Sequence, residues 1–87
     1  MNNSSPAITV YSKPACVQCT MTKKALEKKG IAYAEVDVTE NAAVLEYVTE
    51  ELGYSAAPVV VVDDENHWSG FQPQKIDAVA AALGRTA

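Results

Sequence analysis

Residues 10–19 have the sequence Val10-Tyr11-Ser12-Lys13-Pro14-Ala15-Cys16-Val17-Gln18-Cys19. The β-branched and aromatic residues at 7–11 predict a strand, and a proline-containing loop follows it. Helical character begins at Cys16, so Cys16 and Cys19 lie one turn apart on the same helix face, with Cβ atoms about 5–6 Å apart. That spacing can close to a disulfide with modest adjustment. In a chain with two cysteines, a pair at this spacing indicates redox or metal-binding chemistry at a helix start.

The remaining sequence alternates between strand-like and helix-like patterns. We expect helices at residues 16–29, about 40–52 and 73–83, and strands at 7–11, 33–38, 58–62 and 67–69. A strand–helix–strand connection makes the first two strands parallel, whereas the turn at 63–66 joins the last two as an antiparallel hairpin. The order β-α-β-α-β-β-α therefore predicts an α/β fold, in which three helices cover the two faces of a four-stranded mixed sheet.

Each expected helix has an apolar stripe. In the first helix the stripe contains Val17, Met21, Ala25 and Lys28, with Leu26 beside it. Thr39 is expected to cap the second helix. The stripe of the second helix is Val44, Leu45, Val48 and Leu52, and that of the last is Ile76, Val79, Ala80 and Leu83.

Length and charge narrow the classes of function. The length of 87 residues predicts a single domain. We expect this domain at residues 7–84, between a disordered leader at 1–6 and a frayed tail at 85–87. Seven basic and 11 acidic residues give a net charge of −4, which argues against nonspecific nucleic-acid binding. No apolar run reaches the roughly 18 residues of a membrane span, and the polar leader lacks the order of a signal peptide. We therefore expect a cytoplasmic protein. A monomer is the default expectation for a chain this small.

The helix start gives the two cysteines different roles. The N–H groups of the first turn and the helix dipole favour the thiolate of Cys16. Lys13 either adds a positive charge to this effect or is a solvated loop residue. Cys16 is then the nucleophile, which attacks a disulfide of a partner to form a mixed disulfide. Cys19 remains protonated and resolves that intermediate by attacking the Cys16 sulfur.

Two other interpretations of the cysteine pair remain open. Zinc requires about four ligands, and the chain offers two cysteines and His67, so we expect no metal in a single chain. A metal cluster shared by two copies is a related alternative. The chain could also be a noncatalytic binding module with an incidental thiol pair, and that interpretation predicts that Cys16→Ser leaves function intact.

Pro58 begins the apolar run at 59–62. Proline is tolerated at the first residue of a strand because its missing donor is not needed there. A cis bond before Pro58 would turn the Ala57 backbone outward. An extended segment of a partner would then pair with it by strand addition.

Three runs of sequence carry a resemblance. They are Val10 to Cys19, Ala57-Pro58-Val59-Val60 and His67-Trp68-Ser69-Gly70-Phe71-Gln72-Pro73. Together they resemble the NrdH-redoxin family, which is glutaredoxin-like in sequence and has the thioredoxin/glutaredoxin fold. The combination of Cys-Val-Gln-Cys with Trp-Ser-Gly-Phe is much more specific than C-x-x-C alone. The resemblance implies that Cys16 and Cys19 are the redox pair and that Pro58 is the family's cis-proline.

The resemblance also implies a function. Members of this family take electrons from NADPH through thioredoxin reductase and pass them to the large subunit of class Ib ribonucleotide reductase, for deoxyribonucleotide synthesis. They need no cofactor beyond the redox-active disulfide, here Cys16–Cys19. The alternative is a glutaredoxin or mycoredoxin-like enzyme that uses a low-molecular-weight thiol. Val17-Gln18 between the cysteines and Ser69-Gly70 in the later turn depart from the glutathione-using pattern of Pro-Tyr and Gly-Gly.

A wider set of residues is expected to contact partners. It comprises Lys13, Val17, Gln18, Ala57, Pro58, Trp68, Ser69, Gly70 and Phe71. Trp68 and Phe71 have a second interpretation, as core or turn packing. Gln72 replaces the Arg that many family members have in this run, so any contact it makes is neutral.

Overall fold

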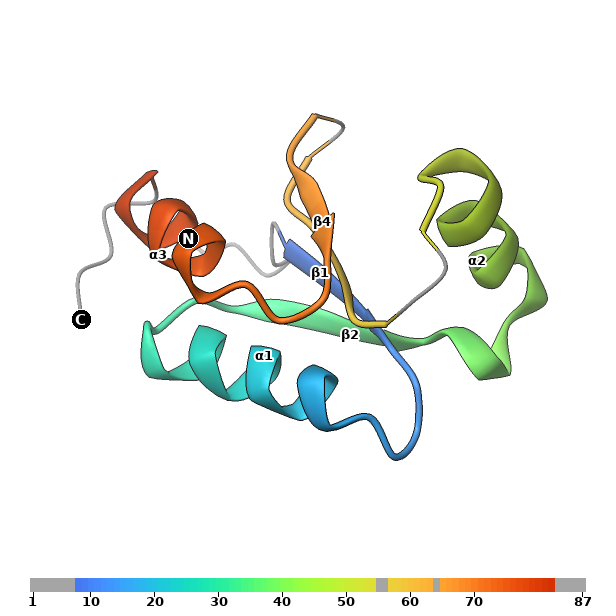
Figure 1. Cartoon of the computed structure of the whole chain (residues 1–87), viewed down its shortest axis with the longest axis horizontal. Helices are drawn as coiled ribbons and strands as arrows, with labels where there is room; N and C mark the ends of the chain where they lie inside the picture. The colour runs from blue at the N-terminus through green and yellow to red at the C-terminus, as the bar shows by residue number, and fades with distance from the viewer. Residues whose placement is uncertain (1–7, 55–56, 64, 83–87) are drawn as a thin grey trace, which may run out of the picture.

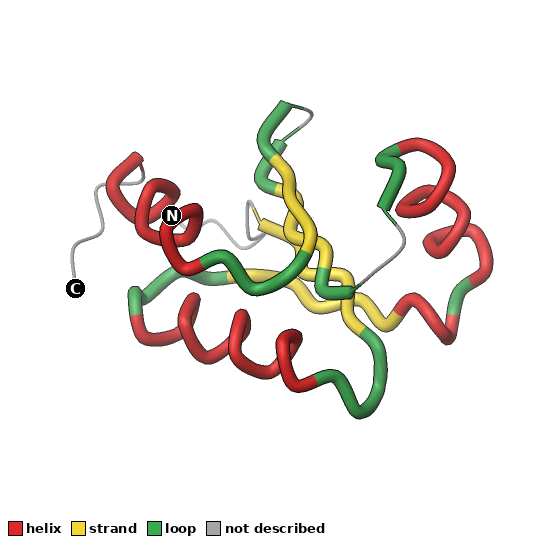
Figure 2. The backbone as a smooth tube through the Cα atoms, in the orientation of Figure 1, coloured by secondary structure: helices red, strands yellow, loops and turns green. Residues whose placement is uncertain are grey.

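The computed structural model describes residues 8–54, 57–63 and 65–82. Its strands are β1 (Ile8–Ser12), β2 (Tyr33–Asp37), β3 (Val59–Val61) and β4 (His67–Ser69). Its helices are α1 (Val17–Lys28), α2 (Ala42–Glu46) and α3 (Pro73–Ala82), with a 3₁₀ turn η1 (Val38–Glu40) before α2 and a π-helical turn η2 (Tyr47–Glu51) after it. Figures 1 and 2 show this arrangement, which confirms the predicted fold class. The predicted leader and tail, together with Ala7, Leu83 and Gly84, lie outside the described residues.

The strands form one mixed sheet in the order β2-β1-β3-β4. β1 and β2 are parallel, and β3 is antiparallel to both β1 and β4. The parallel pairing of β1 with β2 and the antiparallel hairpin of β3 with β4 were both predicted. Val10 lies opposite Val60, and Val60 lies opposite Trp68. Residues that are directly opposite share a face of a sheet, so this row carries apolar side chains across three strands.

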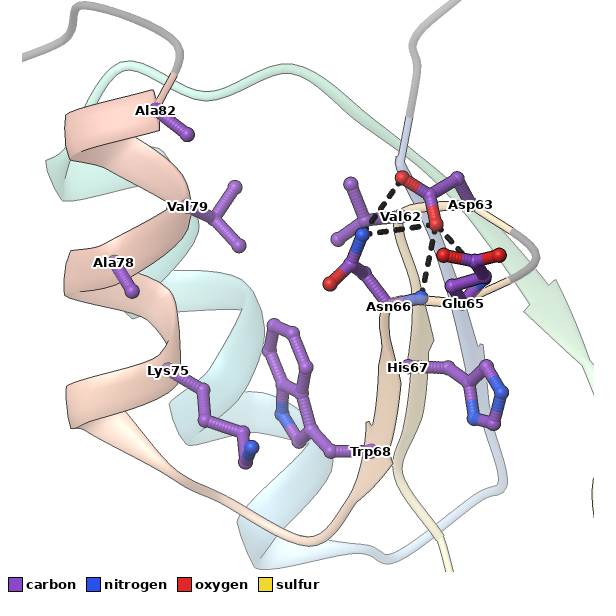
Figure 3. Close-up of a pocket in the computed structure, with 10 residues that line it drawn as sticks. All are labelled: Val62, Asp63, Glu65, Asn66, His67, Trp68, Lys75, Ala78, Val79 and Ala82. Atoms are coloured by element: carbon purple, nitrogen blue, oxygen red, sulfur yellow. Dashed lines mark hydrogen bonds between the residues drawn. The ribbon is translucent and has the colours of Figure 1, made fainter.

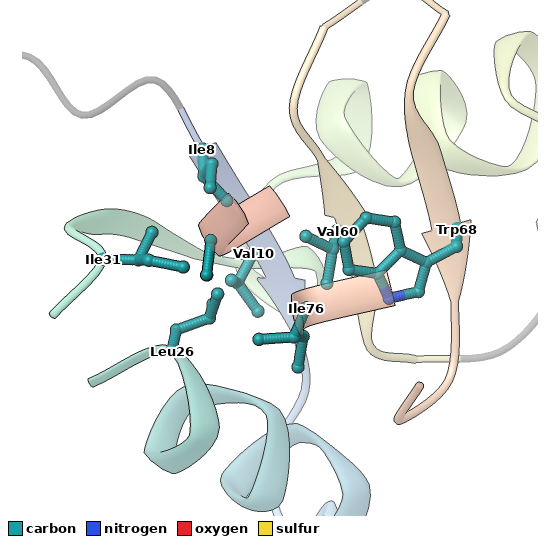
Figure 4. Packing of buried hydrophobic residues seen from close by; sticks show 8 residues of the cluster. Ile8, Val10, Leu26, Ile31, Val60, Trp68 and Ile76 are labelled. Carbon is teal, nitrogen blue, oxygen red and sulfur yellow. The ribbon is translucent and has the colours of Figure 1, made fainter. Parts of the chain in front are cut away.

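The two faces of the sheet are covered by different helices. Ile8 and Val10 of β1 pack with Leu26 of α1 and Ile76 of α3 in the main core cluster, and Figure 4 shows these side chains converging. Tyr11, the residue after Val10, points to the other face, because side chains alternate along a strand. There its ring meets Tyr47 of η2, with ring centroids 6.0 Å apart. One face is therefore covered by α1 and α3, and the other by α2 and η2.

The apolar stripe predicted for α1 is only partly correct: Leu26 belongs to the core cluster and Ala25 packs against it. The buried residues of the helix are Cys19, Thr22 and Leu26, whereas Val17 and Met21 are 73% and 43% exposed. Leu26, which is fully buried, sets the rotation of the helix. Residues three to four apart share a face, so this rotation directs the small side chains of Cys19 and Thr22 toward the sheet.

The second helical segment also differs from the prediction. Asn41, and not Thr39, caps α2, and its side-chain oxygen accepts hydrogen bonds from the backbone N–H groups of Ala43 and Val44 at 3.0 and 3.2 Å. Thr39 lies in η1, where its own N–H donates to Asp37 at 2.8 Å. Two successive Asx-type caps break the predicted single helix into a 3₁₀ turn and a short α-helix.

The apolar stripes of the later helices are only partly buried. Val48 is the buried member of the second stripe, and Leu45 is 45% exposed. Ile76 and Ala80 of α3 are buried, and Val79 packs against them. None of the helices in the described part of the chain is long and apolar enough to cross a membrane.

Candidate active site

Cys16 and Cys19 are joined by a disulfide at the start of α1. Cys16 is the N-cap residue, and its sulfur accepts a hydrogen bond from the backbone N–H of Cys19 at 3.1 Å. Cys16 is half-buried, while Cys19 is only 2% exposed. A partner can therefore reach Cys16 more readily than Cys19, which agrees with the roles of nucleophile and resolving thiol.

The loop before α1 forms a shallow hollow around the disulfide. Its lining includes both cysteines, Lys13, Val17, Lys23 and Glu35. Lys13 and Val17 are exposed. The structure thus brings two of the predicted partner-contacting residues next to the redox pair.

One side of the hollow is an ion pair that the sequence analysis missed. Lys23 Nζ lies 2.7 Å from a Glu35 carboxylate oxygen, which also accepts a hydrogen bond from the Ser12 hydroxyl at 2.8 Å. The bond from Lys23 and that from Ser12 hold the pKa of Glu35 below its ordinary value. Lys23 and Glu35 are 12 residues apart, and no local motif connects them.

The turn after β4 lies against the start of α1. The backbone N–H of Phe71 donates to the side-chain oxygen of Gln18 at 3.0 Å. The N–H of Gly70 donates to the carbonyl of Pro58 at 2.8 Å. Within the turn, the Gln72 amide donates to the carbonyl of Ser69 at 2.9 Å. The neutral Gln72 therefore makes a contact that closes the turn on itself.

The peptide bond between Ala57 and Pro58 is cis. Pro58 is buried and Ala57 half-buried. Through its bond to Gly70, Pro58 belongs to the same assembly as Gln18 and Phe71. Three segments that are far apart in the sequence, at 16–19, 57–58 and 69–71, thus meet on one side of the molecule.

Trp68 has a different position from the other predicted partner-contacting residues. Its side chain is 5% exposed and belongs to the main core cluster. Figure 3 shows its indole between β4 and α3, where it lines a groove with residues such as Lys75 and Val79. The residues that line this groove do not include the cysteines. Burial favours the packing interpretation of Trp68. Phe71, which is half-buried, keeps both interpretations.

His67 was also missed as a contact residue. It is half-buried, and its Nδ1 lies 2.8 Å from the Tyr54 hydroxyl. The two rings meet edge to face, with centroids 5.6 Å apart. This contact ties the segment after η2 to β4.

Known proteins are similar to this chain in sequence and in fold. A family model described as Glutaredoxin matches residues 8–68. The glutaredoxin-like protein NrdH of Lactococcus lactis subsp. lactis strain IL1403 is 42% identical over 73 residues, which cover 84% of this chain and 99% of that protein. The protein of the same name from Escherichia coli strain K12 is 35% identical over 75 residues, which cover 86% of this chain and 90% of that protein. This chain belongs to the glutaredoxin family, within its NrdH group.

A solved structure supports the same assignment for this NrdH-type chain. The glutaredoxin-like protein NrdH-redoxin from Escherichia coli superposes with a TM-score of 0.77 at 35% identity, covering 83% of this chain and 92% of that one. The resemblance and the thioredoxin/glutaredoxin-like fold predicted from the sequence are both confirmed. The NrdH-type chain is a thiol–disulfide oxidoreductase with its C-x-x-C pair at Cys16 and Cys19. The roles predicted for individual partner-contacting residues stay predictions.

Proposed function

We propose that this protein is reduced by NADPH-dependent thioredoxin reductase and donates electrons to the large subunit of class Ib ribonucleotide reductase, in support of deoxyribonucleotide synthesis in the cytoplasm. One observation carries the choice of reductase. The Escherichia coli relative, at 35% identity, is a glutaredoxin-like protein with a thioredoxin-like activity profile. The relatives from Lactococcus and Escherichia are named NrdH.

The geometry supports a two-step exchange. The Cys16 thiolate attacks one sulfur of the partner's disulfide, a mixed disulfide forms, and the partner's other sulfur leaves as a thiolate. Cys19 then loses its proton and attacks the Cys16 sulfur, so that the partner leaves fully reduced. The protein is oxidised to the Cys16–Cys19 disulfide, and the partner takes up two electrons and two protons. NADPH supplies two electrons through the reductase to restore the dithiol. We propose that the protein works as a monomer and needs no cofactor or metal beyond this disulfide.

A glutaredoxin or mycoredoxin-like enzyme is the second candidate. The match to the Glutaredoxin family model favours it, because that family includes enzymes that use a low-molecular-weight thiol. In that case glutathione or a related thiol, and not thioredoxin reductase, would reduce the Cys16–Cys19 disulfide.

The experiment that separates the two candidates is a coupled assay of NADPH oxidation with insulin as the disulfide substrate. The oxidised protein is supplied either with thioredoxin reductase or with glutathione and glutathione reductase. We expect turnover with thioredoxin reductase alone, and its loss in Cys16→Ser. Efficient turnover with glutathione would contradict the proposal and favour the second candidate. A purified class Ib ribonucleotide reductase then tests the electron acceptor, with Lys75→Ala on the exposed face of α3 as a control variant.

A further inference from the structure

The turn at 69–72 is held from two directions. On one side, Gly70 donates to the carbonyl of Pro58 at 2.8 Å, which fixes the turn to the segment before β3. On the other side, Phe71 donates to Gln18 at 3.0 Å, which fixes it to α1. The second of these bonds ties the turn to the helix that carries the cysteines.

Gln18 lies between the two cysteines in sequence and is exposed. Its side chain nevertheless contacts a backbone group 53 residues away. Gln18 lies directly against Gly70, because a Cβ added to Gly70 would be in van der Waals contact with the Gln18 side-chain oxygen, at 3.4 Å. Gly70 also has a φ of +85°, a conformation that other residues adopt only with strain. The backbone conformation of the turn therefore favours glycine at position 70, next to Gln18.

The bond has a chemical consequence for the surface next to Cys16. A backbone N–H in a turn with positive φ is a ready donor for carboxylates. Without Gln18, the N–H of Phe71 would be such a donor within reach of the residues beside Cys16. The neutral amide oxygen of Gln18 already occupies it.

We propose that Gln18 is a specificity-determining positioning residue. It holds the 69–72 turn in place to receive protein disulfides, and it occupies the Phe71 donor that the carboxylate of a small thiol would otherwise use. This inference rests on the proposed function in one respect, namely that the physiological acceptor is a protein disulfide.

The test uses the full chain after reduction with dithiothreitol, so that neither reductase nor ribonucleotide reductase is needed. Three disulfides are offered: insulin, glutathione disulfide and uncharged hydroxyethyl disulfide. In each reaction the dithiol is oxidised to the Cys16–Cys19 disulfide, and the added disulfide is reduced to two thiols that carry the two protons. Ratios of the second-order rate constants are compared, because a change in the reactivity of Cys16 alone affects all three reactions and cancels in the ratios.

Four variants separate the parts of the proposal. Gln18→Leu and Gln18→Ala both remove the side-chain oxygen that accepts from Phe71. The leucine keeps a large apolar side chain at this position, and the alanine does not. Gln18→Glu keeps an acceptor at the same reach. Gln74→Leu makes the same substitution at an exposed position of α3. The amide hydrogen exchange of Phe71 in the oxidised protein reports the bond directly.

In Gln18→Leu and Gln18→Ala we expect the Phe71 amide to exchange faster. The ratio of the glutathione disulfide rate to the hydroxyethyl disulfide rate should rise about two- to tenfold, the range of one hydrogen bond. The ratio of the insulin rate to the hydroxyethyl disulfide rate should fall. Gln18→Glu should retain Phe71 protection and keep the glutathione ratio low, and Gln74→Leu should match the wild-type protein.

Two results would overturn the inference. One is equal Phe71 exchange in all variants, which would show that Gln18 does not hold the turn. The other is faster Phe71 exchange with unchanged rate ratios, which would show that the bond has no effect on substrate choice. Failure of thioredoxin reductase to reduce the protein would refute the proposed function, while these ratios would still decide the role of Gln18.

Discussion

Cys16 and Cys19 are three residues apart, but they differ in how far they are exposed to solvent. Cys16 caps α1 and borders an open hollow, whereas Cys19 lies on the buried face of the helix and is 2% exposed. Thiol–disulfide exchange requires access to the attacking sulfur. We therefore predict that Cys16 reacts first and Cys19 second, because the N-cap lies one turn before the buried face of the helix begins.

This asymmetry predicts opposite behaviour of the two single-cysteine variants. After reduction, Cys19→Ser should react with insulin and accumulate a mixed disulfide through Cys16, because the resolving thiol is missing. Cys16→Ser should form little adduct, because its remaining thiol is buried. Mass spectrometry of the intact protein, with the double variant as control, measures both. More adduct in Cys16→Ser than in Cys19→Ser would reverse the assignment of the two thiols.

At the scale of elements, one carboxylate joins three parts of the fold. Glu35 of β2 accepts from Ser12 at the end of β1 and pairs with Lys23 of α1. The two contacts hold the pKa of Glu35 below its ordinary value, with the bond to Lys23 the larger cause. A carboxylate with a lowered pKa in the folded state stabilises the fold above its ordinary pKa. That stabilisation is lost as the pH falls through the lowered pKa.

The difference in unfolding free energy between the wild-type protein and Glu35→Gln should therefore depend on pH. At pH 7 we expect the variant to be less stable by about 1 kcal/mol or less, since exposed ion pairs contribute modestly. The difference should shrink as the pH falls below the ordinary value of 4.5. Urea denaturation across this pH range measures it, with Glu46→Gln, an exposed carboxylate on α2, as control. A difference that is constant with pH would show that the charge of Glu35 is not the cause.

The sequence predicts the order of elements better than it predicts which side of a helix is buried. Strand patterns predict the boundaries of most elements, and the structure agrees to within a few residues. The buried face of α1 could not be found from apolar periodicity, because Cys19 and Thr22 are small or polar and the apolar Val17 and Met21 are exposed. Packing against the sheet around Leu26 decides it.

The candidate site likewise has a part that the sequence predicts and a part that it does not. The cysteine pair is local, so its spacing in the sequence is enough to find it. The bonds from Gly70 to Pro58 and from Phe71 to Gln18 depend on segments that meet only through the sheet and its connections. A resemblance to a family brings these residues to attention, but it does not show that Gln18 bonds to the backbone of Phe71.

At the scale of the whole molecule, a small core carries the fold. Among the described residues, its main cluster contains eight that are buried. They come from the sheet, from the two helices of one face and from the segment between α1 and β2. Ile76 of α3, which is 1% exposed, lies among residues from β1, β3 and α1 (Figure 4). Because domains are stable by only about 5–15 kcal/mol, the loss of one such side chain is a large share of the total.

Ile76→Ala should lower the unfolding free energy by about 2–5 kcal/mol, and Ile76→Val by about 0.5–1.5 kcal/mol. Urea denaturation followed by the fluorescence of Trp68, the single tryptophan, should show a lower midpoint with an unchanged slope. Lys75→Ala, one residue earlier on the exposed side of α3, should change the free energy by less than about 0.5 kcal/mol. Equal losses for Ile76→Ala and Lys75→Ala would contradict the position of α3 in the core.

During synthesis the residues of the site leave the ribosome in the order of the sequence. Cys16 and Cys19 emerge early, Pro58 emerges after about two thirds of the chain, and Phe71 follows only shortly before Ile76 and Ala80 complete the core. For much of its synthesis the chain therefore carries both thiols without the turn that meets α1 in the finished protein. A chain that stops before residue 69 would keep both cysteines and lose the turn that bonds to Gln18 and Pro58.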